Sequence, residues 1–484
     1  MLGRSLPEYV LIRLSILVLQ LVPLLSIAYL CASWRYGHAL YSPWLATYAG
    51  LETSFYFLVS VPRNSWLQKA ATHPPVPSRK EREALFAKCF AQLRGTSFAT
   101  GWFHFADPKL IKRENLVDWL LWAFFGTRRD GLQEEWAEEI EGYLRNIEQL
   151  LGHKIEEGRN HTVHALKVSL DPVVTANRPL LWYVIVALID TIATTQLYLK
   201  GFRHYAPSGA WVCCFPPRPL TVFSNKSTRD GLIYWLRPHR STTKDPILFF
   251  HGIGIGLWPY VSFLQELANA DPEVGIIATE CLAISMRISP TPLSRPEMLT
   301  ALTALLNAHS VPRVVVVAHS YGTVHAAHML RDPTLSARVS AWVFIDPIPF
   351  LLHQPSVAYN FVYREPRAAN EWAVWYYASR DPDIARTLAR HFFWTENILW
   401  KEDVAGRDVV VVLSELDQIV DAREVRRYLT DDEADEPKFR WEKDGLQVLW
   451  YRGIDHAQVF DTKTRRGPLV RILCSFAERK GWLV

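Results

Sequence analysis

A continuous apolar run that ends on a serine between small residues places the tightest constraint on this chain. From Arg313 to Leu330 the sequence reads RVVVVAHSYGTVHAAHML, so four valines lead into Ala-His-Ser-Tyr-Gly and the pattern then becomes helical. A valine run without polar alternation is typical of a strand that is buried on both faces of a sheet. Ser320 therefore lies where a buried strand turns into a helix, and Ala318 and Gly322 are small enough to let that turn close.

Five further apolar runs show the same texture in the second half of the chain, and helical stretches separate most of them. Strands and helices that alternate at this spacing predict an α/β fold with a doubly wound, mostly parallel sheet. Two earlier runs, PLTVFS (219–224) and GLIYWL (231–236), predict a hairpin that leads into this sheet. The five runs span 246–250, 274–279, 341–345, 408–413 and 446–450.

A serine hydroxyl needs a base within hydrogen-bonding distance before it acts as a nucleophile at neutral pH. His456 follows the last apolar run, where a loop at the carboxyl edge of the sheet would carry such a base. His319, His325 and His328 share the turn or helix of the serine and cannot easily reach back to it, so we expect them to pack or to lie at the surface. We predict no metal site, because the pair His325 and His328 has no third ligand and no HExxH motif is present.

Two aspartates compete for the role of the acid that orients this histidine. Asp417 follows the run 408–413, and Asp346 ends the run 341–345. Chain order and loop placement favour Asp417, and Asp346 is the alternative acid. We expect Asp421 and Asp455 to be solvated loop residues.

A glycine-rich turn, His251-Gly-Ile-Gly-Ile-Gly256, directly follows the run 246–250. Glycines allow backbone N–H groups to point toward a developing oxyanion. We expect the donors to be the amide of Ile253 or Gly254 together with the amide of Tyr321. The turn does not match G-x-G-x-x-G, which argues against a dinucleotide site, and the chemistry requires no cofactor.

The N-terminal segment predicts a membrane anchor. Residues 14–33 carry no charge in 20 residues, and a helix of that length spans about 30 Å, the thickness of a bilayer core. Such a segment is longer than the apolar part of most cleaved signals, so a retained anchor is favoured. A second apolar stretch, 43–61, carries Glu52 at its middle, which makes a second crossing costly. We predict a membrane protein of single-pass or two-pass topology, with the endoplasmic reticulum as a candidate organelle.

The segment between this anchor and the sheet is read as an accessory region. Residues 72–78, THPPVPS, form a Pro-rich linker, and 79–170 look helical without any site chemistry. The segment 179–199 predicts an amphipathic helix with Asp190 on its polar face. We therefore divide the chain into an anchor region (1–70), a helical accessory region (71–210) and a catalytic domain (211–484).

A long insertion, about 347–405, separates two of the predicted strands and is expected to form a cap. It contains the aromatic segments EWAVWYYASRD and ARHFFWTENILW. These side chains either line a substrate pocket or lid, or pack the cap against the sheet.

Composition excludes other classes of protein. The net charge is only +4, and no basic stripe interleaved with aromatic residues is present, so we predict no nucleic-acid partner. The six cysteines include no CxxC pair, which argues against a zinc or redox site.

With HGIGIG, AHSYG, LDQIVD and GIDHAQVF taken together, the chain resembles the α/β-hydrolase superfamily over about 217–484. The resemblance implies that Ser320 is the nucleophile, His456 the base and Asp417 the orienting acid. In its layout the chain is similar to fungal membrane-associated α/β hydrolases. It is more distantly similar to hydrolase-fold proteins of fungal natural-product clusters of the cytochalasan type.

These features predict a membrane-anchored serine hydrolase that cleaves an ester of an apolar or lipid-like acid through an acyl-enzyme. One alternative is a biosynthetic enzyme that uses the same residues to cyclise or condense a polyketide-type intermediate. Another is a non-catalytic binding protein that keeps the fold. A complete Ser-His-Asp set argues against this last class, because nothing structural requires all three residues.

Overall fold

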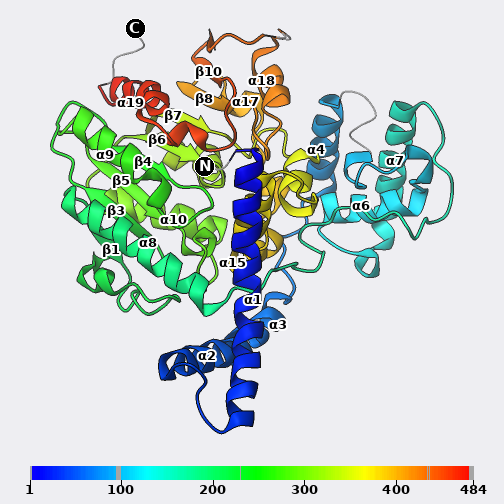
Figure 1. Ribbon diagram of the computed structural model, residues 1–484. Helices are drawn as coiled ribbons and strands as arrows, with labels where there is room; N and C mark the ends of the chain where they lie inside the picture. Colours follow the sequence, from blue (N-terminus) through cyan, green and yellow to red (C-terminus); the bar gives the residue numbers. More distant parts are fainter. Residues whose placement is uncertain (1–2, 94–99, 229–230, 433, 435, 479–484) are drawn as a thin grey trace.

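A twisted sheet of ten strands, counted over the described residues, forms the centre of the computed structural model (Figure 1). The structure describes residues 3–93, 100–228, 231–432, 434 and 436–478. The strands are β1 (Arg203–Ala206), β2 (Asn225–Lys226), β3 (Ile233–Arg237), β4 (Ile247–Phe250), β5 (Ile276–Glu280), β6 (Val314–His319), β7 (Val339–Ile345), β8 (Val409–Ser414), β9 (Arg440–Lys443) and β10 (Leu446–Tyr451). Their order is β2-β1-β3-β5-β4-β6-β7-β8-β10-β9.

The prediction of a mostly parallel sheet is confirmed. The six apolar runs are strands β4, β5, β6, β7, β8 and β10, and each pairs in parallel with its neighbours from this set. All residues of β4, β5, β6, β8 and β10 are buried. This burial explains why these runs show no polar alternation.

Helices cover both faces of the sheet. Alternate valines of β6 pack into the core on one face and the core on the other. Val314 and Val316 pack with α10 (Arg295–Ala308), α11 (Gly322–Arg331) and α18 (Ala422–Thr430). Val315 and Val317 belong to the opposite core, with α8 (Leu180–Leu199), α9 (Val261–Ala270) and α19 (Lys463–Ala477). Successive side chains of a strand point to opposite faces, so one valine run serves both cores.

The predicted leading hairpin is wrong. Residues Pro219–Phe223 form a short 3-10 helix that begins with proline, and Phe223 is exposed, so this run has no buried face to offer a sheet. The antiparallel partners of β3 are β1 and β5 instead. Because β1 begins at Arg203, the sheet starts before the predicted domain boundary at 211.

The accessory region has a hydrophobic core of its own. Its helices are α4 (Arg79–Ala91), α6 (Arg113–Phe125) and α7 (Ala137–Leu151). Leu120, Leu144 and Tyr143 are among the buried residues of this core. Residues 152–178 then lead to α8 without regular secondary structure. Figure 1 shows this region beside the cap, on the far side from α8 and α9.

The insertion between β7 and β8 forms the cap, and its two aromatic segments have different surroundings. Tyr377 of the first segment donates a hydrogen bond to Ser15. Trp394 of the second donates to the carbonyl oxygen of Ala123 in the accessory region. The cap elements are α13 (Ser356–Ala358), η8 (Tyr359–Tyr363), α14 (Ala369–Ala373), η9 (Val374–Ser379), α15 (Pro382–Arg390), α16 (Trp394–Asn397) and α17 (Lys401–Val404).

The N-terminal segment folds into a helical hairpin that projects from the body of the protein (Figure 1). Helix α1 (Leu6–Tyr36) is followed by α2 (Pro43–Phe55), η1 (Tyr56–Ser60) and α3 (Val61–Leu67). Among the described residues, α1 and α8 are long and apolar enough to cross a membrane. Core helices and signal sequences also meet these two criteria, so length and composition alone do not assign a span.

Helix α8 buries Asp190 against the catalytic domain, together with apolar residues such as Val186 and Leu197. Arg218 donates hydrogen bonds to Asp190 of α8 and to Glu280 at the end of β5, at 3.0–3.1 Å. Arg287 forms a second ion pair with Asp190 at 3.0 Å. The apolar residues Val184, Leu188 and Ile192 lie exposed on the outer side. Apolar residues therefore lie on both faces of α8, and the predicted polar face is divided: Asp190 and Thr194 are buried, while Thr191 and Thr195 are exposed.

We predict that Arg218→Met destabilises the protein by about 3–5 kcal/mol, because it leaves Glu280 and Asp190 as incompletely paired buried charges. Urea unfolding followed by tryptophan fluorescence measures the change. The control is Arg79→Met, which breaks only exposed ion pairs and should leave the midpoint unchanged. An unchanged midpoint for Arg218→Met would contradict the role of this cluster.

Candidate active site

Ser320 lies on a strained turn between β6 and α11. Its φ is +51°, a left-handed conformation that residues other than glycine seldom adopt. A Cβ at Gly322 would lie 2.4 Å from the carbonyl oxygen of Phe250, so only glycine allows this close approach. The sharp turn that the sequence predicts is present, and it directs the serine away from the end of the strand.

The structure brings Ser320, His456 and Asp417 together in one hydrogen-bonded chain. His456 Nε2 lies 2.8 Å from Ser320 Oγ, and His456 Nδ1 lies 2.7 Å from Asp417 Oδ2. The carboxylate accepts a hydrogen bond from Nδ1–H. In the neutral ring, Nε2 is then free to accept a proton from the serine. This is the arrangement that a serine nucleophile requires.

The parallel pairing of β8 and β10 explains how Asp417 meets His456. Each residue follows the carboxyl end of one of these neighbouring strands. Asp417 Oδ1 also accepts hydrogen bonds from the amides of Ile419 and Val420, at 2.8 and 2.9 Å. These two bonds fix the carboxylate so that its other oxygen faces the imidazole.

Asp346, the alternative acid, does not accept a hydrogen bond from the His456 ring. Its carboxylate accepts from the amides of Ser414 and Ala457, at 3.1 and 2.7 Å. Ala457 follows His456 directly and has a φ of +64°. Asp346 therefore holds the turn that carries the histidine, whereas Asp417 contacts the ring.

Asp346, Asp417 and His456 place their ligand atoms within 4.8 Å of one another, as a metal site would. Both carboxylates already accept backbone hydrogen bonds, and the imidazole bonds Asp417 and Ser320. The donor set is thus engaged within the protein, and this geometry is explained without an ion.

A buried tyrosine–histidine pair, Tyr260 and His319, lies behind the serine. The sequence led us to expect His319 to pack or to lie at the surface, and it did not point to Tyr260. The Gly252 amide donates to the Tyr260 hydroxyl at 3.0 Å, and that hydroxyl lies 2.8 Å from His319 Nδ1. His319 Nε2 in turn lies 3.6 Å from Asp346. Burial lowers the pKa of His319 to about 4, so the ring is neutral at neutral pH. No sequence motif marks Tyr260, and only tertiary contacts identify the pair.

The glycine-rich turn leaves two of the predicted oxyanion donors available. Within the described residues, the amides of Ile253 and Tyr321 donate to no backbone acceptor. The Gly254 amide, in contrast, donates to the carbonyl oxygen of Ile284 at 3.2 Å, so it is already engaged. His251 anchors the turn, because its Nε2 accepts from the Cys281 amide at 2.9 Å.

Asp455 is not a solvated loop residue as expected. It is buried and accepts hydrogen bonds from the His456 amide, from Asn370 and from both the amide and side chain of Gln418. It thereby joins the histidine turn to the cap and to the Asp417 loop. Asp421 is exposed but caps the N-terminus of α18.

The surrounding carboxylates control the charge of His456. Burial alone would lower its pKa, but Asp417, Asp346 and Asp455 outweigh this effect and raise the pKa to about 9. These carboxylates therefore stabilise the imidazolium, and the neutral ring that acts as a base becomes the larger fraction only as the pH rises above about 9.

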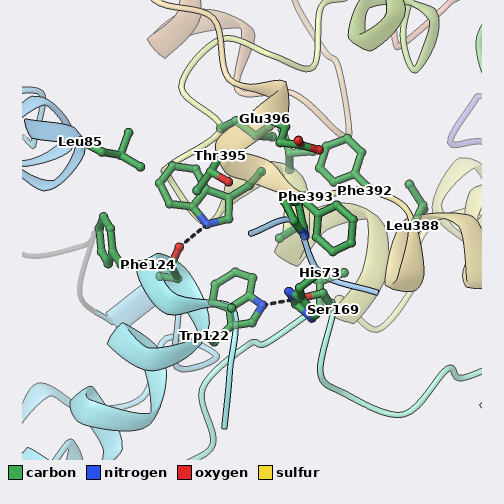
Figure 2. A pocket seen from close by; sticks show the side chains of 18 of the residues that line it. His73, Leu85, Trp122, Phe124, Ser169, Leu388, Phe392, Phe393, Thr395 and Glu396 are labelled. Carbon is green, nitrogen blue, oxygen red and sulfur yellow. Dashed lines mark hydrogen bonds between the residues drawn. The ribbon is translucent and has the colours of Figure 1, made fainter. Parts of the chain in front are cut away.

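A cavity of about 510 Å³ opens beside Ser320. Ile253 and Ile419 line it from the catalytic core, and a larger number of residues line it from the cap and from the accessory region (Figure 2). The predicted linker also contributes, through His73–Pro77. The accessory region, in which the sequence shows no site chemistry, contributes aromatic residues to the lining of this cavity. The cap and accessory residues include Ile348, Leu352, Val357, Phe361, Leu388, Phe392, Phe393, Trp394, Leu85, Trp102, Trp122, Phe124 and Val168.

We predict that Asp417→Asn and Asp346→Asn each lower the pKa of His456, by about 1–3 for the directly bonded Asp417 and by less for Asp346. NMR titration of isotope-labelled histidine measures the pKa, and His309, which lies far from both aspartates in the fold, serves as the internal control. A pKa that stays at about 9 in both variants would refute this account of the electrostatics.

Comparisons with known proteins agree with this fold. Residues 247–467 match the sequence profile described as the alpha/beta hydrolase family. No curated protein matches the chain. A carboxylesterase of the Thaumarchaeon Nitrososphaera gargenis is 15% identical with a TM-score of 0.36, over 51% of this chain and 96% of its own.

Two further solved structures show the same level of similarity. The carboxylesterase CesB of Bacillus subtilis is 11% identical with a TM-score of 0.35, over 60% of this chain and 98% of its own. A bacterial membrane phospholipase A is 14% identical with a TM-score of 0.39, over 62% and 94%. The family profile, the parallel sheet and the turn at Ser320 lead to one conclusion: residues 247–467 have the α/β-hydrolase fold.

Proposed function

We propose that this protein is a serine hydrolase that cleaves esters of apolar acids through an acyl-enzyme. The observation that carries the proposal is the hydrogen-bonded chain from Ser320 through His456 to Asp417, which opens onto the cavity. A histidine that bonds both a serine hydroxyl and a buried carboxylate activates that hydroxyl as a nucleophile.

In the first half of the reaction, His456 Nε2 takes the proton from Ser320 as Oγ attacks the carbonyl carbon of the ester. The amides of Ile253 and Tyr321 donate hydrogen bonds to the resulting oxyanion. Asp417 stabilises the imidazolium that forms. His456 then gives its proton to the leaving alkoxide, which departs as the alcohol and leaves the acyl group on Ser320.

In the second half, His456 takes a proton from a water molecule, which attacks the acyl carbonyl. The tetrahedral intermediate collapses, the carboxylic acid leaves, and Ser320 regains its proton from His456. The atoms balance with water as the only co-reactant. The apolar lining near the serine, which includes Ile348, Phe361 and Leu388, supports an apolar acid as the substrate.

We predict that a fluorophosphonate probe labels the full-length, detergent-solubilised protein and that Ser320→Ala abolishes labelling. His456→Ala should slow labelling by about 10²- to 10⁴-fold, because the general base is lost. Ser356→Ala is the matched control, because this serine lies outside the hydrogen-bonded set of Ser320, His456 and Asp417. It should react at the wild-type rate. A folded wild-type protein that fails to react would overturn the proposal.

Hydrolysis of a reactive ester in H₂¹⁸O separates the hydrolytic outcome from a biosynthetic one. Release of an acid that carries ¹⁸O supports hydrolysis. A product without water-derived oxygen would instead support cyclisation or condensation on the same serine.

We further propose that the α1–α2 hairpin anchors the protein in a bilayer, with the N-terminus and the catalytic domain on the same side. The N-terminal half of α1 is docked on the cap: Ile12 and Ile16 pack in the same core as Tyr376, and Arg13 lies 3.7 Å from the centroid of Trp372. This half of α1 therefore packs against the protein. Only the part of α1 beyond it can enter lipid, together with α2.

A charged residue at the middle of α2 would make it costly to place this helix in lipid, but the contacts of Glu52 avoid that cost. Its side chain is fully buried and accepts hydrogen bonds from the Tyr48 hydroxyl and from the Leu180 amide at the start of α8. The carboxylate therefore does not face lipid. Trp34, Tyr36, Tyr41 and Trp44 are exposed at the end of the hairpin, as is typical of aromatic residues at a membrane interface.

We predict that the full-length protein floats with liposomes and that the double substitution Leu24→Arg and Leu25→Arg weakens this binding at least tenfold. Both leucines are more than 60% exposed on α1, so the change adds charge to the lipid-facing surface without removing core contacts. Leu132→Arg, at an exposed leucine of the accessory region, is the control. Wild-type protein that stays in the soluble fraction would contradict the anchor.

A further inference from the structure

The cavity beside Ser320 lies between the cap and the accessory region. One wall comes from the cap, through Leu388, Phe392 and Phe393, and the other from the accessory region, through Trp122 and Phe124 (Figure 2). The accessory wall belongs to a hydrophobic core that is distinct from the two cores of the sheet. A module outside the catalytic domain therefore forms part of the surface that a substrate would meet.

We propose that the accessory region selects the substrate by the length of its apolar chain, which extends from Ser320 along the cap and ends against Trp122 and Phe124. This inference rests on the proposed function, because it concerns the acid that is esterified to Ser320. It assigns the accessory region a role in specificity rather than in support of the fold alone.

Hydrogen bonds hold the aromatic wall in place. Trp122 Nε1 donates to Ser169 Oγ at 3.0 Å, and Trp394 Nε1 donates to the carbonyl oxygen of Ala123 at 3.0 Å (Figure 2). The second bond joins the cap directly to α6. Because both indole N–H groups already have acceptors, the rings offer only their apolar surfaces to a ligand.

Charge along this wall is neutralised. Arg82 forms a bidentate ion pair with Glu139, at 2.9 and 2.6 Å. Burial lowers the pKa of His73, which favours the neutral ring. The remaining charged residues of the lining are Glu81, Arg295, Arg331 and Glu396. Burial raises the pKa of Glu396, and the two arginines act against this effect. Figure 2 shows Glu396 on the opposite side of the view from Trp122, so the Trp122 side gives an apolar chain the favourable path.

The size of the cavity suits a long chain. Its volume of about 510 Å³ lies inside the range of about 300–1,000 Å³ that is typical of small-molecule sites. Each methylene buried in it should raise the reaction rate about fourfold, which corresponds to about 0.8 kcal/mol. A short acyl group gains nothing from the accessory wall, because it does not reach that wall.

The test uses alkyl fluorophosphonates from two to sixteen carbons on the full-length, detergent-solubilised protein, with the second-order rate of Ser320 labelling as the readout. We expect the rate to rise steeply with chain length. Val168→Phe, which narrows the cavity at the accessory wall, should remove most of this rise, so that the ratio of the sixteen-carbon rate to the two-carbon rate falls toward one. Leu132→Phe, outside the cavity on the same region, is the matched control and should keep the full rise.

A second measurement needs no variant and so does not depend on folding of Val168→Phe. A long-chain fluorophosphonate with a terminal diazirine labels Ser320 and is then activated by light. Mass spectrometry should find the cross-link within 113–126 or at 168–169. Cross-links confined to the cap or to α1, or rates that ignore chain length, would overturn the inference while the proposed hydrolase stands. Absence of labelling by every probe would overturn both.

Discussion

The pairing of parallel strands whose carboxyl ends meet at one edge is the constraint on which the candidate site depends. β6 delivers Ser320 there, while β8 and β10 deliver Asp417 and His456. The strand ends come close only because the strands are buried on both faces and are held in register by helices on each side. Close packing at Gly322 then allows the serine turn to sit directly against β4.

A second set of buried polar groups surrounds the hydrogen-bonded residues Ser320, His456 and Asp417 and holds their loops in position. Tyr260 and His319 reach from the glycine-rich turn toward Asp346, and Asp346 bonds the turn that carries His456. Asp455 connects the same turn to the cap. Buried polar groups that are satisfied in this way favour a single arrangement, because any other leaves a donor or acceptor unpaired.

The cap, the accessory region and the catalytic core meet at one cavity. The cap bonds α1 through Tyr377 and the accessory region through Trp394, while the catalytic core supplies the serine. The proposed membrane hairpin and the proposed chain-length wall are thus both joined to the cap.

The sequence by itself determined the elements whose pattern is local. The apolar runs predict the buried strands, and the small residues around Ser320 predict its sharp turn, because burial and steric limits act on neighbouring residues. Residues whose roles depend on distant partners were missed: Asp455 was expected to be solvated, Gly254 was a candidate donor beside Ile253, and nothing in 79–170 marked Trp122 as part of a cavity wall. Only the tertiary structure decided these, because hydrogen-bond partners and cavity walls come from segments that are far apart in the chain.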